Sequence, residues 1–164
     1  MSITKEDTLF APVGKPAQST AAVGRDYLIF MVHDGDAVDL KLGVDAYNVE
    51  EILNDYSITY LPMVPGYVRG IFNMRGQIVP AVDMRRLLDK PGNDEGLLVV
   101  LVHDDMKIGI LVDAVDKMIN IEDKAITPVP AQESQRFVSG MCTIPDHSGT
   151  LMVLDCDQLF SFHG

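Results

Sequence analysis

The sequence predicts a mainly β protein made of two similar units, each closing into a small five-stranded barrel, with few short helices. Three observations lead to this fold class. Short apolar runs rich in β-branched residues recur along the chain, and turn residues separate them. Long amphipathic helical patterns are missing. The motifs of the first half return in the second half in the same order, roughly 70 residues later.

The N-terminal segment differs in composition from the rest of the chain. Residues 1–25 are rich in Ala, Pro, Gly, Ser and Thr and show no hydrophobic periodicity. Such a segment has too little apolar surface to pack, so we expect a disordered tail. A single domain over residues 26–164 is expected to follow it.

The predicted strands are short apolar runs next to turn residues. The runs at 27–32 (YLIFMV) and 97–102 (LLVVLV) are each followed by His-Asp and a turn. Two further strands, at 76–84 and 149–156, each begin behind a glycine.

Other segments are shorter or ambiguous. Residues 46–53 and 114–119 fit a short helix or a strand, because their periodicity does not distinguish the two. Residues 84–89 and 157–162 predict single helical turns that close each half.

The internal repeat defines two units, roughly 27–90 and 97–160, joined by the turn-rich stretch DKPGNDEG. At about 65 residues each unit is marginal for an independent core. Closing each sheet into a barrel removes edges that are liable to aggregate. We therefore expect two small barrels that share apolar surface, with the two units intertwined or packed together, and a groove between them suited to a partner.

Composition limits the classes of function. The chain has 164 residues, 47% of them hydrophobic, and a net charge of −11, which disfavours nucleic acid as a partner. No apolar run approaches the roughly 18 residues of a membrane-spanning helix, so no membrane insertion is expected. The start MSITKEDTLF lacks the features of a secretory signal, and the two cysteines form no C-x-x-C pattern. A cytoplasmic protein is predicted.

No arrangement of residues in the sequence indicates catalysis. The four histidines are far apart, and His33 and His103 occupy equivalent strand ends, which favours a structural role. The stretch 34–45 resembles a calcium loop but has no glycine at its sixth position and no glutamate at its twelfth. Nucleophile-elbow, P-loop and dinucleotide-binding motifs are absent. We expect no enzyme activity, no cofactor and no metal.

Four of the six arginines lie between residues 68 and 88, although the protein is acidic. Within this stretch, FNMRGQ has the form of a hairpin turn over residues 73–76, in which Gly76 supplies a positive φ and Asn73 caps the turn. Arg75 is then displayed on a stiff turn. The corresponding turn of the second half, TIPDHSG, has no arginine, so the fold does not require one. Arginine is enriched at protein–protein hot spots, which favours a contact role for Arg75.

These segments together resemble the CheW family of bacterial chemotaxis coupling proteins and the CheW-like regulatory domain of the kinase CheA. The resemblance runs from about Tyr27 to Phe160, and its most specific part is VRGIFNMRGQIVPAVDMR. It implies two SH3-like five-stranded barrels around a shared hydrophobic core. It also implies a non-catalytic adaptor that joins the cytoplasmic tips of chemoreceptors to the CheA regulatory domain in membrane-associated arrays, and that is mostly monomeric alone.

The resemblance also implies a binding surface. A receptor helix would lie in the apolar groove between the barrels, while a separate barrel face would pack against the kinase. The residues that match the family pattern are Val49, Glu51, Gly70, Arg75, Gly76 and Val79. Among them we predict an ion pair between Glu51 and Arg75 that holds the turn in register.

Two other functions remain compatible with the sequence. A related adaptor of a non-flagellar pathway, such as twitching motility or development, would have the same features. A β protein that binds a small ligand in the groove is the alternative from another class. One departure from the family is the short C-terminus, which stops four residues after Phe160 where many members continue into a helix.

Overall fold

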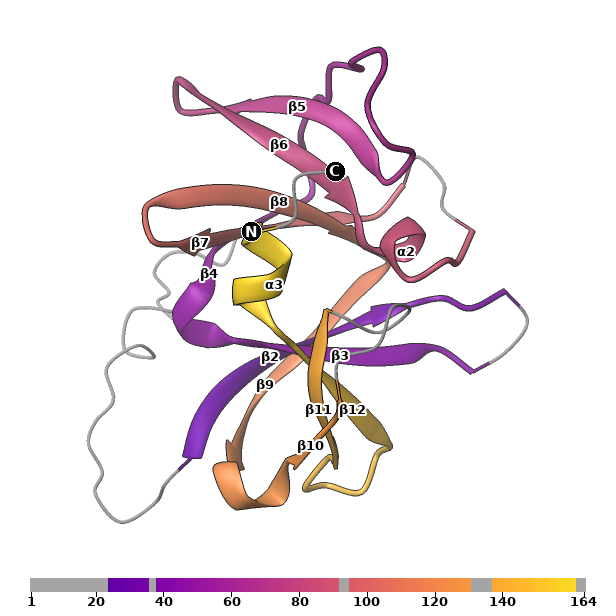
Figure 1. The fold of residues 1–164 in the computed structure, drawn as a ribbon, viewed down its shortest axis with the longest axis vertical. Coiled ribbons are helices and arrows are strands. Elements are labelled where there is room, and N and C mark those ends of the chain that lie inside the picture. The colour runs from indigo at the N-terminus through magenta and orange to yellow at the C-terminus, as the bar shows by residue number, and fades with distance from the viewer. Residues whose placement is uncertain (1–23, 36–37, 92–94, 131–136, 162–164) are drawn as a thin grey trace.

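Over the residues that the structure describes, the protein forms two curled β-sheets, one above the other, with two short helices between them (Figure 1). The structure, a computed structural model, describes residues 24–35, 38–91, 95–130 and 137–161. The six-stranded sheet has the order β10-β11-β12-β3-β2-β9, and the five-stranded sheet has the order β4-β7-β8-β6-β5. The two-sheet architecture confirms the mainly β prediction.

The strands are short and regular. Those of the six-stranded sheet are β2 (Gly24–Val32), β3 (Leu40–Asp45), β9 (Ala114–Glu122), β10 (Thr127–Pro128), β11 (Val138–Thr143) and β12 (Thr150–Leu154). Those of the five-stranded sheet are β4 (Val49–Leu53), β5 (Val68–Met74), β6 (Gln77–Asp83), β7 (Leu97–His103) and β8 (Met106–Val112).

The helices are single turns at strand ends. The helix α2 (Met84–Leu87) follows β6, and the Asp83 carboxylate caps it by accepting a hydrogen bond from the Arg85 backbone N–H. The helix α3 (Cys156–Ser161) follows β12 at the matching place in the second half. Two 3-10 turns, η1 (Ala46–Asn48) and η2 (Asp123–Ala125), also lie within the described residues. Both predicted helical turns are confirmed.

Three sequence predictions are refined by these boundaries. The ambiguous segment 46–53 is a 3-10 turn followed by strand β4, and 114–119 lies in strand β9. The predicted tail, residues 1–25, extends two residues too far. Strand β2 begins at Gly24, which pairs with Glu122 of β9. Residues 1–23 lie outside the described residues.

The two halves of the sequence exchange a hairpin. Strands β2 and β3 come from the first half but lie in the sheet that holds β9 to β12, and β7 and β8 lie among β4, β5 and β6. The pairing repeats with the sequence. β6 pairs in parallel with β8 as β12 does with β3, and β4 pairs antiparallel with β7 as β9 does with β2. The two units are therefore intertwined, which is one of the two arrangements that the repeat leaves open.

Each sheet curls around a core of its own. In the five-stranded sheet, Leu53 of β4 packs against the same cluster as Phe72 of β5, although these strands are opposite ends of the sheet. In the six-stranded sheet, Ile121 of β9 and Cys142 of β11 share a second cluster. Side chains from strands at or next to the opposite ends of a sheet can meet only if the sheet bends back on itself, as in a small barrel.

A third and larger cluster joins the sheets. It contains Phe30 from β2, Leu101 from β7 and Phe160 from α3, among other buried side chains from both sheets. The exchanged hairpins β2–β3 and β7–β8 supply most of it. The predicted shared hydrophobic core is confirmed, and its burial is the main force that holds the sheets together.

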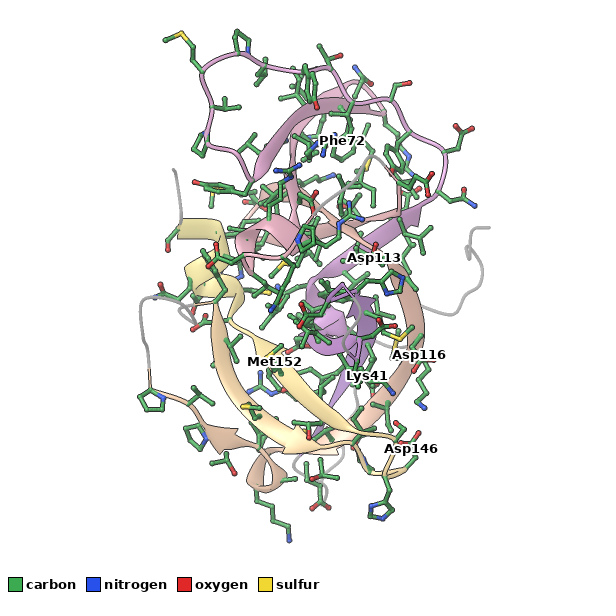
Figure 2. The ribbon with its side chains drawn as sticks, turned by 90° about the vertical axis from the view of Figure 1, so that its right-hand side faces the viewer. Lys41, Phe72, Asp113, Asp116, Asp146 and Met152 are labelled. Atoms are coloured by element: carbon green, nitrogen blue, oxygen red, sulfur yellow. The ribbon has the colours of Figure 1, made fainter. Side chains whose placement is uncertain are left out.

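A buried ion network also links the sheets. The Arg85 guanidinium donates to Asp83 Oδ1 (Nε, 2.8 Å), to Asp113 Oδ1 (Nη1, 2.8 Å) and to the Glu95 carbonyl (2.9 Å). The second oxygen of Asp113 accepts the backbone N–H of His33, at the end of β2 (2.7 Å). Figure 2 shows Asp113 at the waist of the molecule, below Phe72 of the five-stranded sheet. Arg85 thus connects both sheets through Asp113.

Candidate functional site

The hairpin between β5 and β6 has a tighter turn than the sequence predicts. β5 continues to Met74, which pairs with Gln77, so only Arg75 and Gly76 form the turn. Both have positive φ, 52° and 88°, as a type I′ hairpin turn requires. Asn73 Oδ1 accepts the Gly76 N–H at 3.0 Å, which confirms the predicted cap. Arg75 is therefore held in a conformation that most residues avoid.

The predicted ion pair between Arg75 and Glu51 is confirmed. Arg75 Nη2 lies 2.6 Å from Glu51 Oε1, with exposed side-chain fractions of 65% and 29%. Glu51 is on β4 and Arg75 follows β5, so the pair joins the two ends of the five-stranded sheet. Since it is largely exposed, it contributes only about 0–1 kcal/mol to stability. Its main effect is to fix where the guanidinium lies.

The strand that carries Glu51 is itself well positioned. A bulge between Val49 and Glu51 interrupts the pairing of β4 with β7, and Glu50 within it reaches Lys107 Nζ at 3.1 Å. Val49 is half-buried and packs against the core shared by the sheets. Val49 and Glu51 therefore place an apolar group and a charged pair along one short strand at the junction of the sheets.

Val79 does not belong to the surface. Its side chain is 2% exposed and packs in the core of the five-stranded sheet, whereas its neighbour Ile78 is 61% exposed. Side chains alternate between the faces of a strand, so an error of one residue reverses the face. The prediction of Val79 as a contact residue is wrong, and Ile78 is the apolar side chain that β6 exposes.

Gly70 is buried, and its role is one of backbone fit. It has φ 144°, and a Cβ added there would lie 2.0 Å from the Thr59 carbonyl oxygen. Thr59 forms two backbone hydrogen bonds, at 2.7 and 3.0 Å, with Ile71, the residue that follows Gly70. Gly70 thus allows the preceding segment to cover β5, and it presents no surface to a partner.

Sequence reasoning missed a second exposed group near Val49. Tyr47, in η1, is 76% exposed, and its backbone N–H is held by Asp45 Oδ1 at 2.9 Å. The signal was present in the sequence, as a tyrosine two residues before the strand that carries Val49 and Glu51. The sequence pattern of residues 46–53 does not distinguish a helix from a strand, so the direction of the Tyr47 side chain could not be predicted.

Two histidines, His33 and His103, lie at surface contacts with carboxylates. His33 Nδ1 is 2.8 Å from Asp39 Oδ1, and this hydrogen bond raises the pKa of His33. His103 Nε2 is 2.6 Å from Asp157 Oδ1, which ties β7 to α3. Within the described ranges, no group of three or more His, Cys, Asp or Glu side chains is placed to hold a metal ion. None of the helices described there is long and apolar enough to cross a membrane.

Comparison with known proteins decides the family. The model of the CheW-like domain matches residues 26–163. The chain belongs to the CheW-like domain family. The chemotaxis protein CheW of Klebsiella aerogenes is 27% identical over 157 residues, which are 92% of this chain and 89% of that protein. The chemotaxis protein CheW of Rhizobium meliloti is 30% identical over 138 residues, or 80% of this chain and 86% of that protein.

A solved CheW structure has the same architecture. The crystal structure of the scaffolding protein TtCheW from Thermoanaerobacter tengcongensis matches with a TM-score of 0.70 and 25% identity, over 80% of this chain and 88% of that chain. The agreement supports the two-subdomain fold of the CheW-like family for this chain. The Arg75–Glu51 pair and strand β4 lie within the matched residues 26–163.

Proposed function

We propose that this protein is a non-catalytic adaptor of bacterial chemotaxis that couples chemoreceptors to the histidine kinase CheA and supports their arrays. Membership of the CheW-like family over residues 26–163 supports the adaptor role. The observation that carries the proposal is Arg75, an exposed guanidinium held on a two-residue turn and braced by Glu51. A group positioned in this way, in a largely acidic protein, suits recognition of an acidic partner.

The receptor tip would bind as a helix along the junction of the two sheets, beside β4. Val49 and the exposed Ile78 and Tyr47 offer apolar contacts along the sides of such a helix. Arg75 would pair with a carboxylate on the helix, and the bidentate geometry of the guanidinium would set its orientation. Because Arg75 is already ordered by its turn, little side-chain entropy is lost on binding.

The kinase would bind elsewhere. We propose that a separate barrel face packs against the CheA regulatory domain, so that receptor and kinase can be held at once. The protein would be monomeric alone, act in the cytoplasm and reach the membrane only through the receptors. It would need no cofactor, because its mechanism is recognition.

The proposal is tested by removing the guanidinium without disturbing the turn. Asn-Gly is the preferred pair for a type I′ turn, so Arg75→Asn should keep or slightly raise the thermal midpoint. We expect its co-sedimentation with receptor-containing membranes and CheA to fall at least tenfold in apparent affinity. That loss corresponds to about 1.4 kcal/mol or more.

A matched control is available on the other sheet. Arg25 pairs with Asp45 at 3.3 Å, with exposed fractions of 60% and 25%, close to those of Arg75 and Glu51. Arg25→Asn removes the same charge and should leave receptor binding unchanged. If both variants bind receptor like the unmodified protein, the role of Arg75 is refuted. If the unmodified protein enters no complex with cognate receptor and kinase, the adaptor function is refuted.

A further inference from the structure

The sequence repeat gives the molecule two similar junctions between its sheets. Val49 and Ile52 of β4 correspond in the repeat to Val115 and Met118 of β9, and all four side chains pack against the core that the sheets share. β4 pairs antiparallel with β7 as β9 does with β2, and the register of both pairings is irregular within these stretches. We call the two surfaces, one beside each strand, the β4 junction and the β9 junction.

An ion pair links the edge strand of each sheet to a hairpin turn. At the β4 junction, Glu51 of β4 pairs with Arg75 in the turn between β5 and β6. At the β9 junction, Lys117 of β9 forms a hydrogen-bonded ion pair with Asp146 in the turn between β11 and β12. Lys117 has the position in β9 that Glu51 has in β4, because each follows the valine of its strand by two residues. The two pairs are therefore equivalent in position and opposite in charge.

The carboxylate of Asp146 has a fixed position. Its Oδ1 accepts the backbone N–H of Ser148 at 2.9 Å, and Lys41 of β3 donates to the Ser148 carbonyl at 3.1 Å. The hydrogen bond from Lys117 lowers the pKa of Asp146 well below its usual range and raises the pKa of Lys117, so both groups are charged at neutral pH. Figure 2 shows Lys41 and Asp146 on the same side of the six-stranded sheet. The turn of the β9 junction thus holds a carboxylate where the turn of the β4 junction holds a guanidinium.

The two junctions present different charges to a partner. At the β4 junction the cation is the more exposed group, with side-chain fractions of 65% for Arg75 and 29% for Glu51. At the β9 junction the fractions are nearly equal, 39% for Lys117 and 40% for Asp146. A second carboxylate there, Asp116, lies 3.9 Å from the same ammonium group and is 34% exposed. A carboxylate brought to the β9 junction would therefore meet exposed negative charge, and like charges across an interface oppose association.

We propose that Lys117 and Asp146 are specificity-determining residues that confine the receptor helix to the β4 junction. An amphipathic helix can approach either junction along similar strands, but the reversed ion pair repels at β9 the acidic group that Arg75 attracts at β4. The apolar contact is also weaker at β9, because the exposed Ile78 of β6 corresponds to the polar Thr150 of β12. Each molecule then engages a single receptor helix. This inference rests on the proposed adaptor function and adds how the protein distinguishes its two halves.

The test gives the second junction the polarity of the first. Lys117→Glu with Asp146→Arg keeps an ion pair at this place and leaves the net charge of −11 unchanged, so the thermal midpoint should stay similar. This reversal is then combined with Arg75→Asn, which removes the guanidinium from the β4 junction. We expect the triple variant to bind receptor-containing membranes with CheA about threefold or more tightly than Arg75→Asn alone, a gain in K of the size that one exposed charge contact gives.

Hydrogen exchange of the full chain in these complexes locates the receptor helix. In the complex of the unmodified protein, exchange should slow at residues 47–51 and 74–78 and stay unchanged at residues 113–118 and 145–150. In the complex of the triple variant, the protection should appear at residues 113–118 and 145–150 instead. Binding and footprint together show whether the reversed pair redirects the helix.

A matched control reverses another exposed ion pair at the far end of β9. Lys124 Nζ lies 3.8 Å from Glu122 Oε1, and both side chains are exposed. Lys124→Glu with Glu122→Lys also leaves the net charge unchanged. Added to Arg75→Asn, this reversal should recover no receptor binding, because it places no cation in the turn between β11 and β12.

Two results would contradict the inference while leaving the adaptor function intact. One is protection of both junctions in the complex of the unmodified protein, a measurement that needs no variant to fold. The other is a folded triple variant that binds receptor no better than the variant with the control reversal. Failure of the unmodified protein to enter any complex with cognate receptor and kinase would instead refute the adaptor function, and the specificity inference with it.

Discussion

At the residue scale, the neighbours Ile78 and Val79 of β6 should respond differently to the same substitution. Val79→Ala removes buried methyl groups from the core of the five-stranded sheet and should lower the free energy of unfolding by about 2 kcal/mol. Ile78→Ala changes an exposed side chain and should cost less than about 0.5 kcal/mol. Urea denaturation of the two variants measures the difference. Equal costs would show that the strand faces are assigned incorrectly.

The thiol of Cys156 makes a pH-dependent contribution to stability. Burial, and then the charges of Asp45, Asp155 and Asp157, raise the pKa of Cys156 from 9 to about 12. Between these values the unfolded chain loses the thiol proton and the folded chain keeps it. Stability from this group is therefore complete below pH 9 and falls as the pH rises toward 12.

Thiol chemistry and denaturation both check this assignment. The native thiol should react with Ellman's reagent at pH 9 at least tenfold more slowly than the same thiol in urea. Between pH 8 and pH 10.5, the urea midpoint of the unmodified protein should fall further than that of Cys156→Ala. A fast native reaction at Cys156, read by mass spectrometry because Cys142 is also present, would contradict the raised pKa.

At the scale of elements, the hairpin β5–β6 contains two glycines with different functions. Gly76 has φ 88° and open space around it, so Gly76→Ala should cost only the strain of a positive φ, about 1–2 kcal/mol. Gly70→Ala adds a clash with the Thr59 carbonyl at 2.0 Å and should cost clearly more.

The two glycine variants should also differ in where they act. In Gly70→Ala, hydrogen exchange should increase at Thr59 and Ile71, whose mutual hydrogen bonds would be displaced. In Gly76→Ala, faster exchange should be confined to the turn. Faster exchange at Thr59 in both variants would mean that the segment over β5 depends on the turn rather than on Gly70.

Much of this hairpin could be predicted from its sequence, because turn chemistry is local. The glycine with positive φ and the Asn73 cap follow from the residues of the turn itself. The positive φ of Arg75 could not be predicted, since it depends on Met74 pairing with Gln77, which shortens the turn to two residues. For the same reason, the sequence predicts Val79 as the exposed contact residue of β6, whereas the structure exposes Ile78.

At the scale of the whole molecule, Arg85 is the charged link between the sheets. Arg85→Met would leave Asp83 and Asp113 buried without their cation and should lower the free energy of unfolding by about 3–5 kcal/mol. Arg86→Met is the control, because that side chain is half-exposed and only 3.8 Å from Asp83. It should cost less than about 1 kcal/mol. Urea denaturation compares the two, and a mild effect of Arg85→Met would show that the network is dispensable.

The repeat in the sequence correctly predicted the elements and the shared core. It left open whether the two units intertwine or only pack together, because both copies of a repeat offer similar strand edges. Whether β7 pairs with β4 or with β9 depends on contacts far apart in the chain. The network at Arg85 was missed for the same reason, since its partners come from residues 33, 83, 95 and 113.

The exchanged hairpins have a consequence for synthesis on the ribosome. When residues 49–83 have emerged from the ribosome, β7 and β8 are still to be translated. At that point β4 has no neighbouring strand, and β6 is paired with β5 but not with β8. The hairpin β2–β3 stays without its neighbours for longer, because β2 pairs with β9 and β3 pairs with β12, which are translated later. At about 5–20 residues per second, the nascent chain exposes apolar strands for several seconds before either sheet can close. Neither sheet can therefore close until strands from the other half of the sequence have been translated, and chaperones that bind extended apolar segments should associate with this chain while it is being made.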